Sequence, residues 1–278
     1  MRYKIVSDSS SNLQTLEGVD YASVPLKVVT AEKEYVDDAQ LDIGRMQQEL
    51  RAYKGRSGTA CPSVGEWLDS FGQAEGVFAV TITSSLSGAY NACAQAKAEY
   101  EETEGRRVCC LDSLSTGPEM ALIIEKLREL IAAGLDFAQV ESRVREYMKH
   151  THLAFMLESM DNLAKNGRVS PLVARAVGVL GIRVVGRASD EGTLQPLHKC
   201  RGENRGLTTL LREMEARGYK GGRVSVGHCE NEAAALELRA RIKAQHPQAE
   251  MEVMPLRGLC TYYAEKGAIL VGFEDAEA

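Results

Sequence analysis

The sequence predicts an α/β protein of two domains: an N-terminal domain with a doubly wound parallel sheet, and a C-terminal α/β domain with a mixed sheet. Three observations support this fold class. Apolar runs alternate with helical patterns through the first half, as they do in βαβ units. Near residue 150 the pattern changes, and a hairpin follows among helices. A chain of 278 residues with 44% hydrophobic residues also suits two cores better than one. We therefore expect domains at residues 1–150 and 151–278.

The first half contains three short apolar runs that we interpret as strands, at residues 3–7, 76–83 and 107–113. Each is followed by a polar turn and then by a helical pattern. After the third run the apolar residues recur at helical spacing: Met120, Ile123, Ile124, Leu127, Leu130 and Ile131. The next helix runs to about residue 150, and its apolar face consists of Phe137, Val140, Val144, Tyr147 and Met148. Strands connected through helices in this way pair in parallel.

The second half mixes strands, a hairpin and helices. Residues 152–158 are a predicted strand, and residues 170–181 a short helix with Pro171 in its first turn. Residues 182–200 predict a hairpin that turns at Asp190-Glu191-Gly192. The remaining elements are a helix at 204–217, a strand at 223–229, a helix at 230–245, a strand at 251–255 and a strand at 267–273. We expect the acidic residues 274–278 to fray.

Composition and charge exclude several classes of partner. The net charge is −6, from 33 basic and 39 acidic residues, so no general basic face is available for nucleic acid. No apolar run approaches the roughly 18 residues of a membrane span, although transient contact with a membrane surface is compatible with the sequence. Residues 1–10 lack the apolar core of a signal peptide. The seven cysteines form no Cys-x-x-Cys pair, which indicates reduced thiols, and we expect a cytoplasmic protein.

Common catalytic and metal-binding motifs are missing from the sequence. The five histidines form no His-Glu-x-x-His pattern, and His150 and His152 have no cysteine or carboxylate set nearby in the sequence. There is no glycine-rich nucleotide loop and no Gly-x-Ser-x-Gly turn. Ser85 could act as a hydrolase nucleophile, but no partner histidine can be assigned to it. We therefore expect no catalytic residue, no metal site and no cofactor.

Polar turns follow the predicted strands of the first half. They lie at residues 8–11, 84–88 and 112–117 and are rich in Ser, Thr, Asp and Gly. The carboxyl ends of parallel strands meet at one edge of the sheet, where doubly wound folds bind their ligands. A fourth polar turn precedes another helix, where Ser63 and Glu66 have the spacing of a capping box. We expect all four turns to border one crevice.

The turn at residues 84–88, Ser-Ser-Leu-Ser-Gly, has more hydroxyl groups than the start of one helix requires. A single serine caps a helix, and Ser87 before Gly88 is enough for that purpose. Ser84 and Ser85 are then a surplus. The free N–H groups and the dipole of a helix N-terminus also attract anions. The residues alone leave two interpretations open, which are helix capping and a cradle for a carboxylate or phosphate.

Five stretches together resemble the DegV family. "ITSSLSGAYNACAQA" resembles its I-S-S-x-L-S-G-T-Y signature, and "KIVSDSSSNL" resembles its V-T-D-S-T-S-D-L opening. "TACPS" is similar to its T-S-Q-P-S, "LESMDNLAKNGRVS" to its L-x-x-L-K-x-G-G-R-I, and "GTLQPLHKCRGENRGL" to its G-x-x-x-P-x-x-K-x-R. The residues retained in the last three are Thr59, Pro62, Ser63, Gly167, Arg168, Pro196, Lys199 and Arg201. The matches occur in order over nearly the whole chain.

The resemblance implies a lipid carrier and not a complete enzyme. Members of this family are two-domain α/β proteins that bind one long-chain fatty acid in a tunnel at or near the domain junction. FakB-type members present the acid to a separate ATP-using kinase subunit, which forms an acyl phosphate. The resemblance therefore implies a fatty acid as the ligand, a kinase as a partner, and no cofactor.

The resemblance also implies site residues. In the family the carboxylate is held by the threonine of T-S-Q-P-S and by the serine pair before L-S-G, which correspond here to Thr59, Ser84 and Ser85, with Ser63 nearby. A basic stretch contributes to kinase docking in some members, and Lys199 and Arg201 correspond to it.

The chain departs from the family pattern at several positions. The histidine of the family's C-terminal H-T-G-P-G, which contacts the carboxylate, has no counterpart in "RGLCTYYAEKGAILVGF". Tyr262 or Tyr263 could supply a phenol in its place, or could belong to the core. The second docking arginine is Glu203, and the glutamine of T-S-Q-P-S is Cys61. An alternative function is therefore binding of a different amphipathic or anionic ligand on the same fold.

Overall fold

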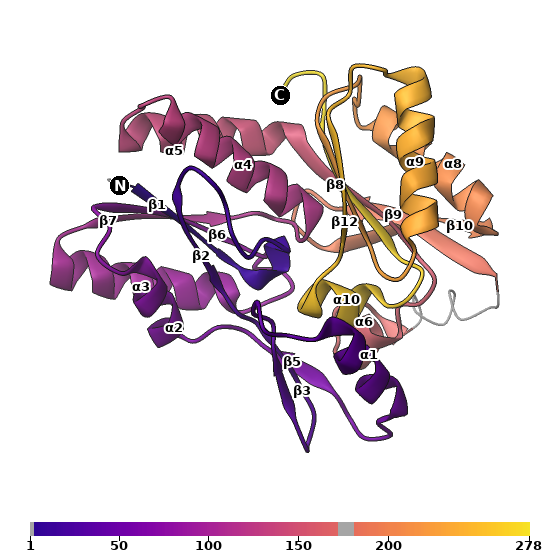
Figure 1. Ribbon diagram of the computed structural model, residues 1–278, viewed down its shortest axis with the longest axis horizontal. Helices are drawn as coiled ribbons and strands as arrows, with labels where there is room; N and C mark the ends of the chain where they lie inside the picture. Colours follow the sequence, from indigo (N-terminus) through magenta and orange to yellow (C-terminus); the bar gives the residue numbers. More distant parts are fainter. Residues whose placement is uncertain (1–2, 172–180) are drawn as a thin grey trace.

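The computed structural model describes residues 3–171 and 181–278. Two large sheets stand side by side with helices between and around them, and a small third sheet lies below the first (Figure 1). The helix predicted at 170–181 falls almost entirely outside the described residues. Within the described ranges, no helix is both long and apolar enough to cross a membrane.

The first large sheet is entirely parallel and has helices on both faces. Its strands are β1 (Tyr3–Asp8), β2 (Asp20–Val24), β6 (Gly76–Thr81) and β7 (Arg107–Asp112), in the order β2-β1-β6-β7. Helices α2 (Val64–Phe71) and α3 (Ala89–Glu104) pack on one face, and α4 (Pro118–Ala132) and α5 (Phe137–Tyr147) on the other. Alternate strand residues serve the two faces, because successive side chains of a strand point in opposite directions. The predicted doubly wound sheet is confirmed, but its edge strand β2 was not among the strands predicted from the sequence.

The second large sheet is mixed, as the sequence predicts. Its strands are β8 (Thr151–Leu157), β9 (Ile182–Ala188), β10 (Leu194–Arg201), β11 (Val224–His228), β12 (Met251–Pro255) and β13 (Ile269–Glu274), in the order β10-β9-β8-β13-β11-β12. Only the β11–β12 pair is parallel among these described strands. Helices α8 (Glu203–Ala216) and α9 (Glu232–Gln245) cover one face. The other face turns toward the first sheet and the short helix α6 (Asp161–Lys165).

A third, antiparallel sheet was not predicted from the sequence. It contains β3 (Lys27–Val29), β4 (Glu34–Val36) and β5 (Gly58–Ala60), in the order β4-β3-β5, and is accompanied by α1 (Ile43–Ala52). Helix α10 (Gly258–Ala264), from the other end of the chain, packs against this unit. Tyr262 of α10 shares a buried cluster with Val28, Tyr35 and Met46. Residues distant in sequence thus come together beside β5. The division into domains at residue 150 stays a prediction.

Among the described residues, the 3-10 turn η1 (Ser9–Ser11) follows β1, and the 3-10 turn η2 (Met148–His150) precedes β8. The prediction that the acidic tail frays is wrong. The Asp275 N–H donates to the His150 carbonyl at 2.9 Å, and the Ala276 N–H donates to the Gly218 carbonyl at 3.1 Å. The Asp275 carboxylate also lies 3.1 Å from Nε2 of His152. Backbone and side-chain partners that are remote in sequence hold the tail to residue 276.

Helix α4 connects the two large sheets. Its apolar side belongs to the core of the first sheet, while its N-terminus touches β13, where a Cβ on Gly272 would collide with the backbone of Glu119. The Glu119 carboxylate accepts a hydrogen bond from the Thr151 hydroxyl at 2.9 Å. Burial raises the pKa of Glu119 from its ordinary value of 4.5 to about 7.

Glu119→Gln should change how stability depends on pH. The raised pKa means that the native state holds the Glu119 proton more tightly, so this contribution to stability is present below pH 4.5 and is lost as the pH rises toward 7. Glutamine stays neutral, so the variant should gain up to about 3 kcal/mol relative to wild type across that interval. Urea unfolding from pH 4.5 to 8 measures this difference. A difference in unfolding free energy that stays constant across the interval would contradict this prediction.

Candidate functional site

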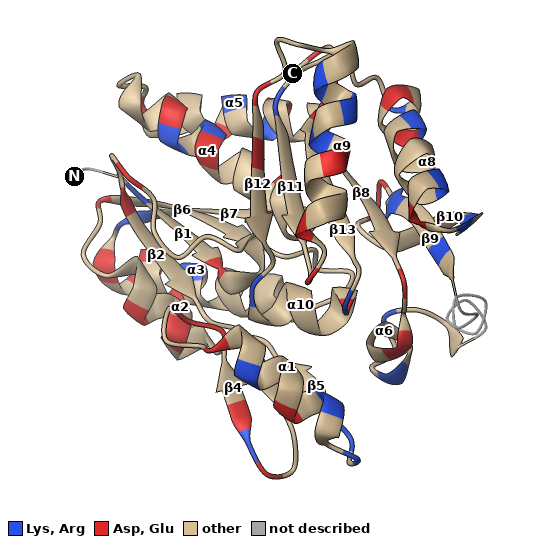
Figure 2. Ribbon diagram, turned by 45° about the vertical axis from the view of Figure 1, so that its right-hand side comes forward, with Lys and Arg blue, Asp and Glu red and all other residues tan. Residues whose placement is uncertain are grey.

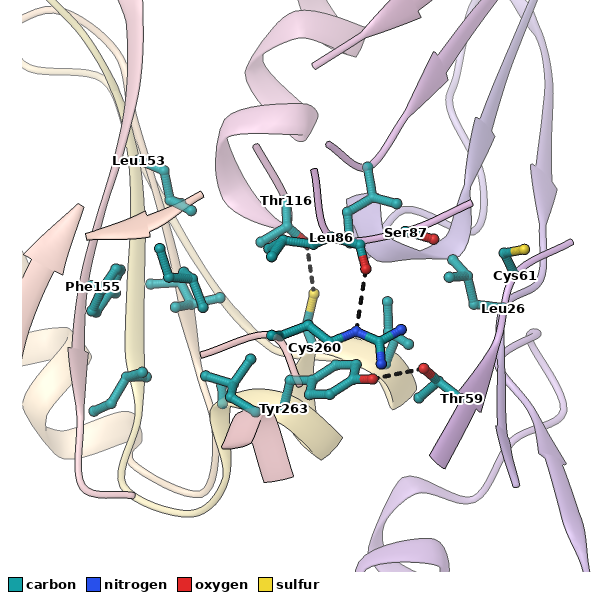
Figure 3. A pocket seen from close by; sticks show the side chains of 18 of the residues that line it. Leu26, Thr59, Cys61, Leu86, Ser87, Thr116, Leu153, Phe155, Cys260 and Tyr263 are labelled. Carbon is teal, nitrogen blue, oxygen red and sulfur yellow. Dashed lines mark hydrogen bonds between the residues drawn. The ribbon is translucent and has the colours of Figure 1, made fainter. Parts of the chain in front are cut away.

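A cavity of about 320 Å³ lies between the two large sheets (Figure 3). One side consists of apolar residues of β8, namely Leu153, Phe155 and Leu157. The opposite side is closed by β5, the turn between β6 and α3, and α10. Figure 3 shows Leu153 and Phe155 across the cavity from Thr59. The volume is near the lower end of the roughly 300–1,000 Å³ range of small-molecule sites.

The polar groups of the cavity gather near Thr59. The Thr59 hydroxyl lies 2.7 Å from the phenol oxygen of Tyr263, and either can be the donor. The Arg168 guanidinium lies 5.7 Å from the centre of the Tyr263 ring. Burial raises the pKa of Tyr263, so its phenol keeps its proton at neutral pH and can donate a hydrogen bond. The hydroxyl groups of Thr59 and Tyr263 and the Arg168 guanidinium therefore border the same end of a mainly apolar space.

The position of Tyr263 depends on how α10 begins. The N–H groups of Gly258 and Leu259 donate to the Asp37 carboxylate at 3.0 and 2.9 Å. Asp37 follows β4 and is 1% exposed, so it supplies the cap that this helix start lacks locally. Thr59 is fixed by pairing opposite Val28 of β3. The small sheet and Asp37, the residue after its strand β4, thus fix both the position of Thr59 and the orientation of α10.

Arg168 follows α6 and reaches across to the turn before α3. Its Nε donates to the Leu86 carbonyl at 3.3 Å, and one Nη donates to the Asn166 carbonyl at 2.6 Å. The structure places Arg168 on the cavity lining. The retained Gly167-Arg168 pair was the available signal for it.

Tyr262 and Tyr263, the two candidates for a phenol donor, point in different directions. Tyr263 lines the cavity. The Tyr262 hydroxyl instead lies 2.8 Å from the Ser57 hydroxyl and accepts from the Asn166 side chain at 3.0 Å, outside the cavity. Neighbouring residues on a helix differ by about 100° in direction, so only one of them can face the ligand space. The geometry favours Tyr263.

The predicted serines do not line this cavity. The N–H of Ser84 donates to Asp112 at 3.1 Å, and the hydroxyl of Ser85 donates to the Glu191 carbonyl at 2.5 Å. In the same turn, Ser87 and Gly88 do line it. The Ser87 hydroxyl accepts from the Ala89 N–H at 3.2 Å, at the start of α3.

Ser63 caps α2, as the sequence predicts. Its side chain accepts from the N–H of Glu66, while the Glu66 carboxylate accepts from the N–H of Ser63, so the capping box is confirmed. Ser63 is exposed and is not part of the cavity lining. Capping accounts for its position without a ligand.

Lys199 and Arg201 are exposed on β10, the edge strand of the second sheet, and neither lines the cavity. Figure 2 shows basic residues on this strand. Cys200 between them is buried beneath α8. Glu203, at the position of the family's second arginine, accepts a hydrogen bond from the Asn231 side chain at 2.9 Å. The two basic side chains are therefore available to a partner on this edge.

Thr116, from the predicted polar turn at residues 112–117, and Cys260, which the sequence did not reveal, also line the cavity. Their side-chain oxygen and sulfur are 3.6 Å apart. Burial raises the pKa of Cys260 to about 12, so the thiol is protonated and is not a nucleophile at neutral pH. Among the described residues, no group of three or more His, Cys, Asp or Glu could hold a metal ion. The arrangement suits binding of an amphipathic anion.

Comparisons with known proteins match the chain from end to end. The model of the DegV family, described as uncharacterised, matches residues 2–275. A DegV domain-containing protein of Streptococcus pneumoniae is 40% identical over 279 residues, which cover 99% of each chain. Among solved structures, a DegV family protein of Eubacterium eligens loaded with heptadecanoic acid has a TM-score of 0.96 and 42% identity, over 98% of this chain and 99% of that one. The Fatty Acid Kinase (Fak) B3 protein of Streptococcus pneumoniae, loaded with linoleic acid, has a TM-score of 0.97 and 40% identity over 99% of both chains.

Proposed function

The chain belongs to the DegV family, and we propose on this basis that it binds one long-chain fatty acid between its two large sheets and presents the carboxylate to a separate kinase for acyl-phosphate formation. It acts as a carrier and leaves the catalysis to its partner. The observation that carries this proposal is the cavity itself, which is apolar along β8 and has two hydroxyl groups and a guanidinium at its other side.

The acyl tail supplies the affinity. Burial of one methylene is favourable by about 0.8 kcal/mol, so a tail of about fourteen could contribute roughly 11 kcal/mol as an upper bound. Association and ordering remove several kcal/mol of that gain. The remainder suffices for tight binding without any strong contact to the carboxylate. The polar end of the cavity therefore has the different task of accommodating the headgroup.

The headgroup must not be buried without partners, because an unpaired carboxylate costs several kcal/mol. We assign Thr59 and Tyr263 as its hydroxyl donors, with the Arg168 cation beside them. Arg168 already donates to two backbone carbonyls, which leaves less of its hydrogen-bonding capacity for the ligand. A carboxylate held chiefly by neutral hydroxyls keeps the electron density with which it attacks a phosphoryl group.

The remaining residues that the resemblance assigns to the headgroup have weaker support in the structure than Thr59. Ser84 and Ser85 would have to turn from their present partners to reach the ligand, so Ser87 is the more direct candidate in that turn. Ser63 and Tyr262 have alternative partners that account for them. The alternative ligand, a different amphipathic anion, would use the same polar end.

The kinase partner is supported by the similarity to the Fatty Acid Kinase (Fak) B3 protein over nearly the whole of both chains. We propose the exposed Lys199 and Arg201 of β10 as docking contacts, since exposed charges steer association. We also propose a cytoplasmic location, which the seven unpaired cysteines favour.

Native mass spectrometry tests the proposed function. The purified protein should carry one acyl-chain mass per chain, or take up one equivalent of oleate or palmitate after delipidation. Denaturing spectra of the same sample give the mass of the chain alone as the reference. A protein that neither carries nor takes up a fatty acid would contradict the proposed function. A different bound mass would support the alternative ligand.

A further inference from the structure

A second cavity, of about 430 Å³, adjoins the first at Leu153. It is bordered by the start of β8, the end of β9, the N-terminus of α4 and the C-terminal part of α8. Leu153 lines both cavities, and it is the only described residue that does. Its side chain is 3% exposed, so it fills the space between them.

The pairing of the second sheet explains why two cavities meet at this residue. Strand β8 begins at Thr151, but its pairing with β9 starts only at Ala154, opposite Arg187. On the other side Leu153 pairs with Gly272 of β13. The next β9 residue, Ala188, makes no ladder pair with Leu153. At this corner, side chains and not a paired strand separate the two cavities.

Leu153 stands at the tail side of the proposed acyl site. Figure 3 shows it across the cavity from Thr59 and Tyr263, which border the polar end. An acid whose carboxylate meets these hydroxyl groups directs its methyl end toward β8. The terminal methyl then meets Leu153 before it can reach the second cavity.

The second cavity can accept hydrocarbon next to this partition. Ala154 and Phe273, each 1% exposed, and the partly buried Met148 are apolar members of its wall. The charged groups at its border have partners of their own: Arg217 pairs with Asp190 at 2.6 Å, and Arg145 pairs with Glu141 at 2.9 Å. The Glu119 carboxyl, which also borders it, accepts a hydrogen bond from Thr151.

We propose that Leu153 sets the upper length of the acyl chain by closing the first cavity against the second. This inference rests on the proposed function. In the wild-type protein a chain that fills the first cavity ends at the Leu153 side chain. Shortening that side chain joins the cavities and lets the methyl end of a longer acid continue past β8.

Oleate and erucate are suitable probes, because both carry a cis double bond at the same distance from the methyl end and erucate is longer by four methylenes. Their affinities are measured by displacement of a fluorescent fatty acid. Each additional methylene that becomes buried can raise affinity by up to about fourfold. Leu153→Ala should therefore shift the erucate-to-oleate affinity ratio by about tenfold or more in favour of erucate.

Leu210→Ala is the matched control. It is the same truncation at a buried leucine of α8 that lines neither cavity. Its ratio should remain that of wild type. A second substitution should reverse the effect of the first. Ala188 lines only the second cavity, so a phenylalanine there fills that space, and Ala188→Phe in the Leu153→Ala background should restore the wild-type affinity ratio.

The outcomes separate the two proposals. Wild-type protein that binds neither acid overturns the proposed function. Wild-type protein that binds oleate, combined with an unchanged ratio in Leu153→Ala, overturns the role of Leu153 alone. If Leu153→Ala does not fold, Leu153→Val has the same readout with a smaller shift, and an unchanged ratio there overturns the role equally.

Discussion

Replacing Ala264 by tryptophan should abolish fatty-acid binding. Ala264 is buried on α10 and lines the first cavity, so an indole at this position occupies space that the acyl tail requires. If the indole keeps about six methylenes of the acid from being buried, the binding free energy falls by about 5 kcal/mol, which corresponds to more than a thousandfold in affinity. The added side chain fills a space without disturbing a filled core, so the cost to folding should be small compared with ordinary overpacking.

Two measurements make this prediction sharp. Isothermal titration with oleate should give no saturable binding for Ala264→Trp, while its far-ultraviolet circular dichroism and thermal unfolding remain cooperative. Ala133→Trp, the same substitution at the exposed end of α4, should bind as wild type does. Retained affinity in folded Ala264→Trp protein would show that the acid binds somewhere else.

The second large effect should come from removing both hydroxyl groups at the polar end. Thr59→Val and Tyr263→Phe keep nearly the shape of each side chain and delete the two oxygens that lie 2.7 Å apart. Hydrogen bonds to a charged group contribute about 1.5–3 kcal/mol each, so the double variant should lose roughly a hundredfold or more in oleate affinity. Titration of the delipidated variant with oleate measures the loss.

The chain supplies a matched control for this pair. Ser57 and Tyr262 form a second hydroxyl pair, 2.8 Å apart, between the residue before β5 and the same helix α10. Neither lines the cavity. Ser57→Ala with Tyr262→Phe should therefore lose local stability but keep oleate affinity within about twofold of wild type. Equal losses in the two double variants would argue against a headgroup role for Thr59 and Tyr263.

Elements with a strong periodic pattern or a local sequence signature could be predicted from the sequence. Strands β1, β6 and β7 are short apolar runs, and the capping box at Ser63 has a local signature, so these were found. Strand β2 was missed, because its residues are mostly exposed or half-buried and form no apolar run. The small sheet was missed because strands of three residues, such as β3 and β5, are too short to show alternation. Helix α10 has only seven residues and no local cap, since Asp37 provides one from far away in the chain.

The site was harder to predict because its register depends on those missed elements. Whether Tyr262 or Tyr263 faces the cavity is decided by the rotation of α10, and that rotation is set by contacts with the small sheet. Ser84 and Ser85 are close in sequence to Ser87, yet they turn toward Asp112 and Glu191. A motif identifies the turn that borders a site, but not which of its side chains points inward.

Because Asp37 caps α10, the headgroup site forms only when residues from the two ends of the chain pack together. Thr59 belongs to the early residues and Tyr263 to the late ones, and the hydrogen bonds of Asp37 to Gly258 and Leu259 fix their relative position. Ligand occupancy and cohesion between the two ends of the chain are therefore thermodynamically linked: a bound acid stabilises the association of α10 with the small sheet by RT ln(1 + [L]/Kd). Reciprocally, a partner that loosened that association would lower the affinity for the acid and promote its release.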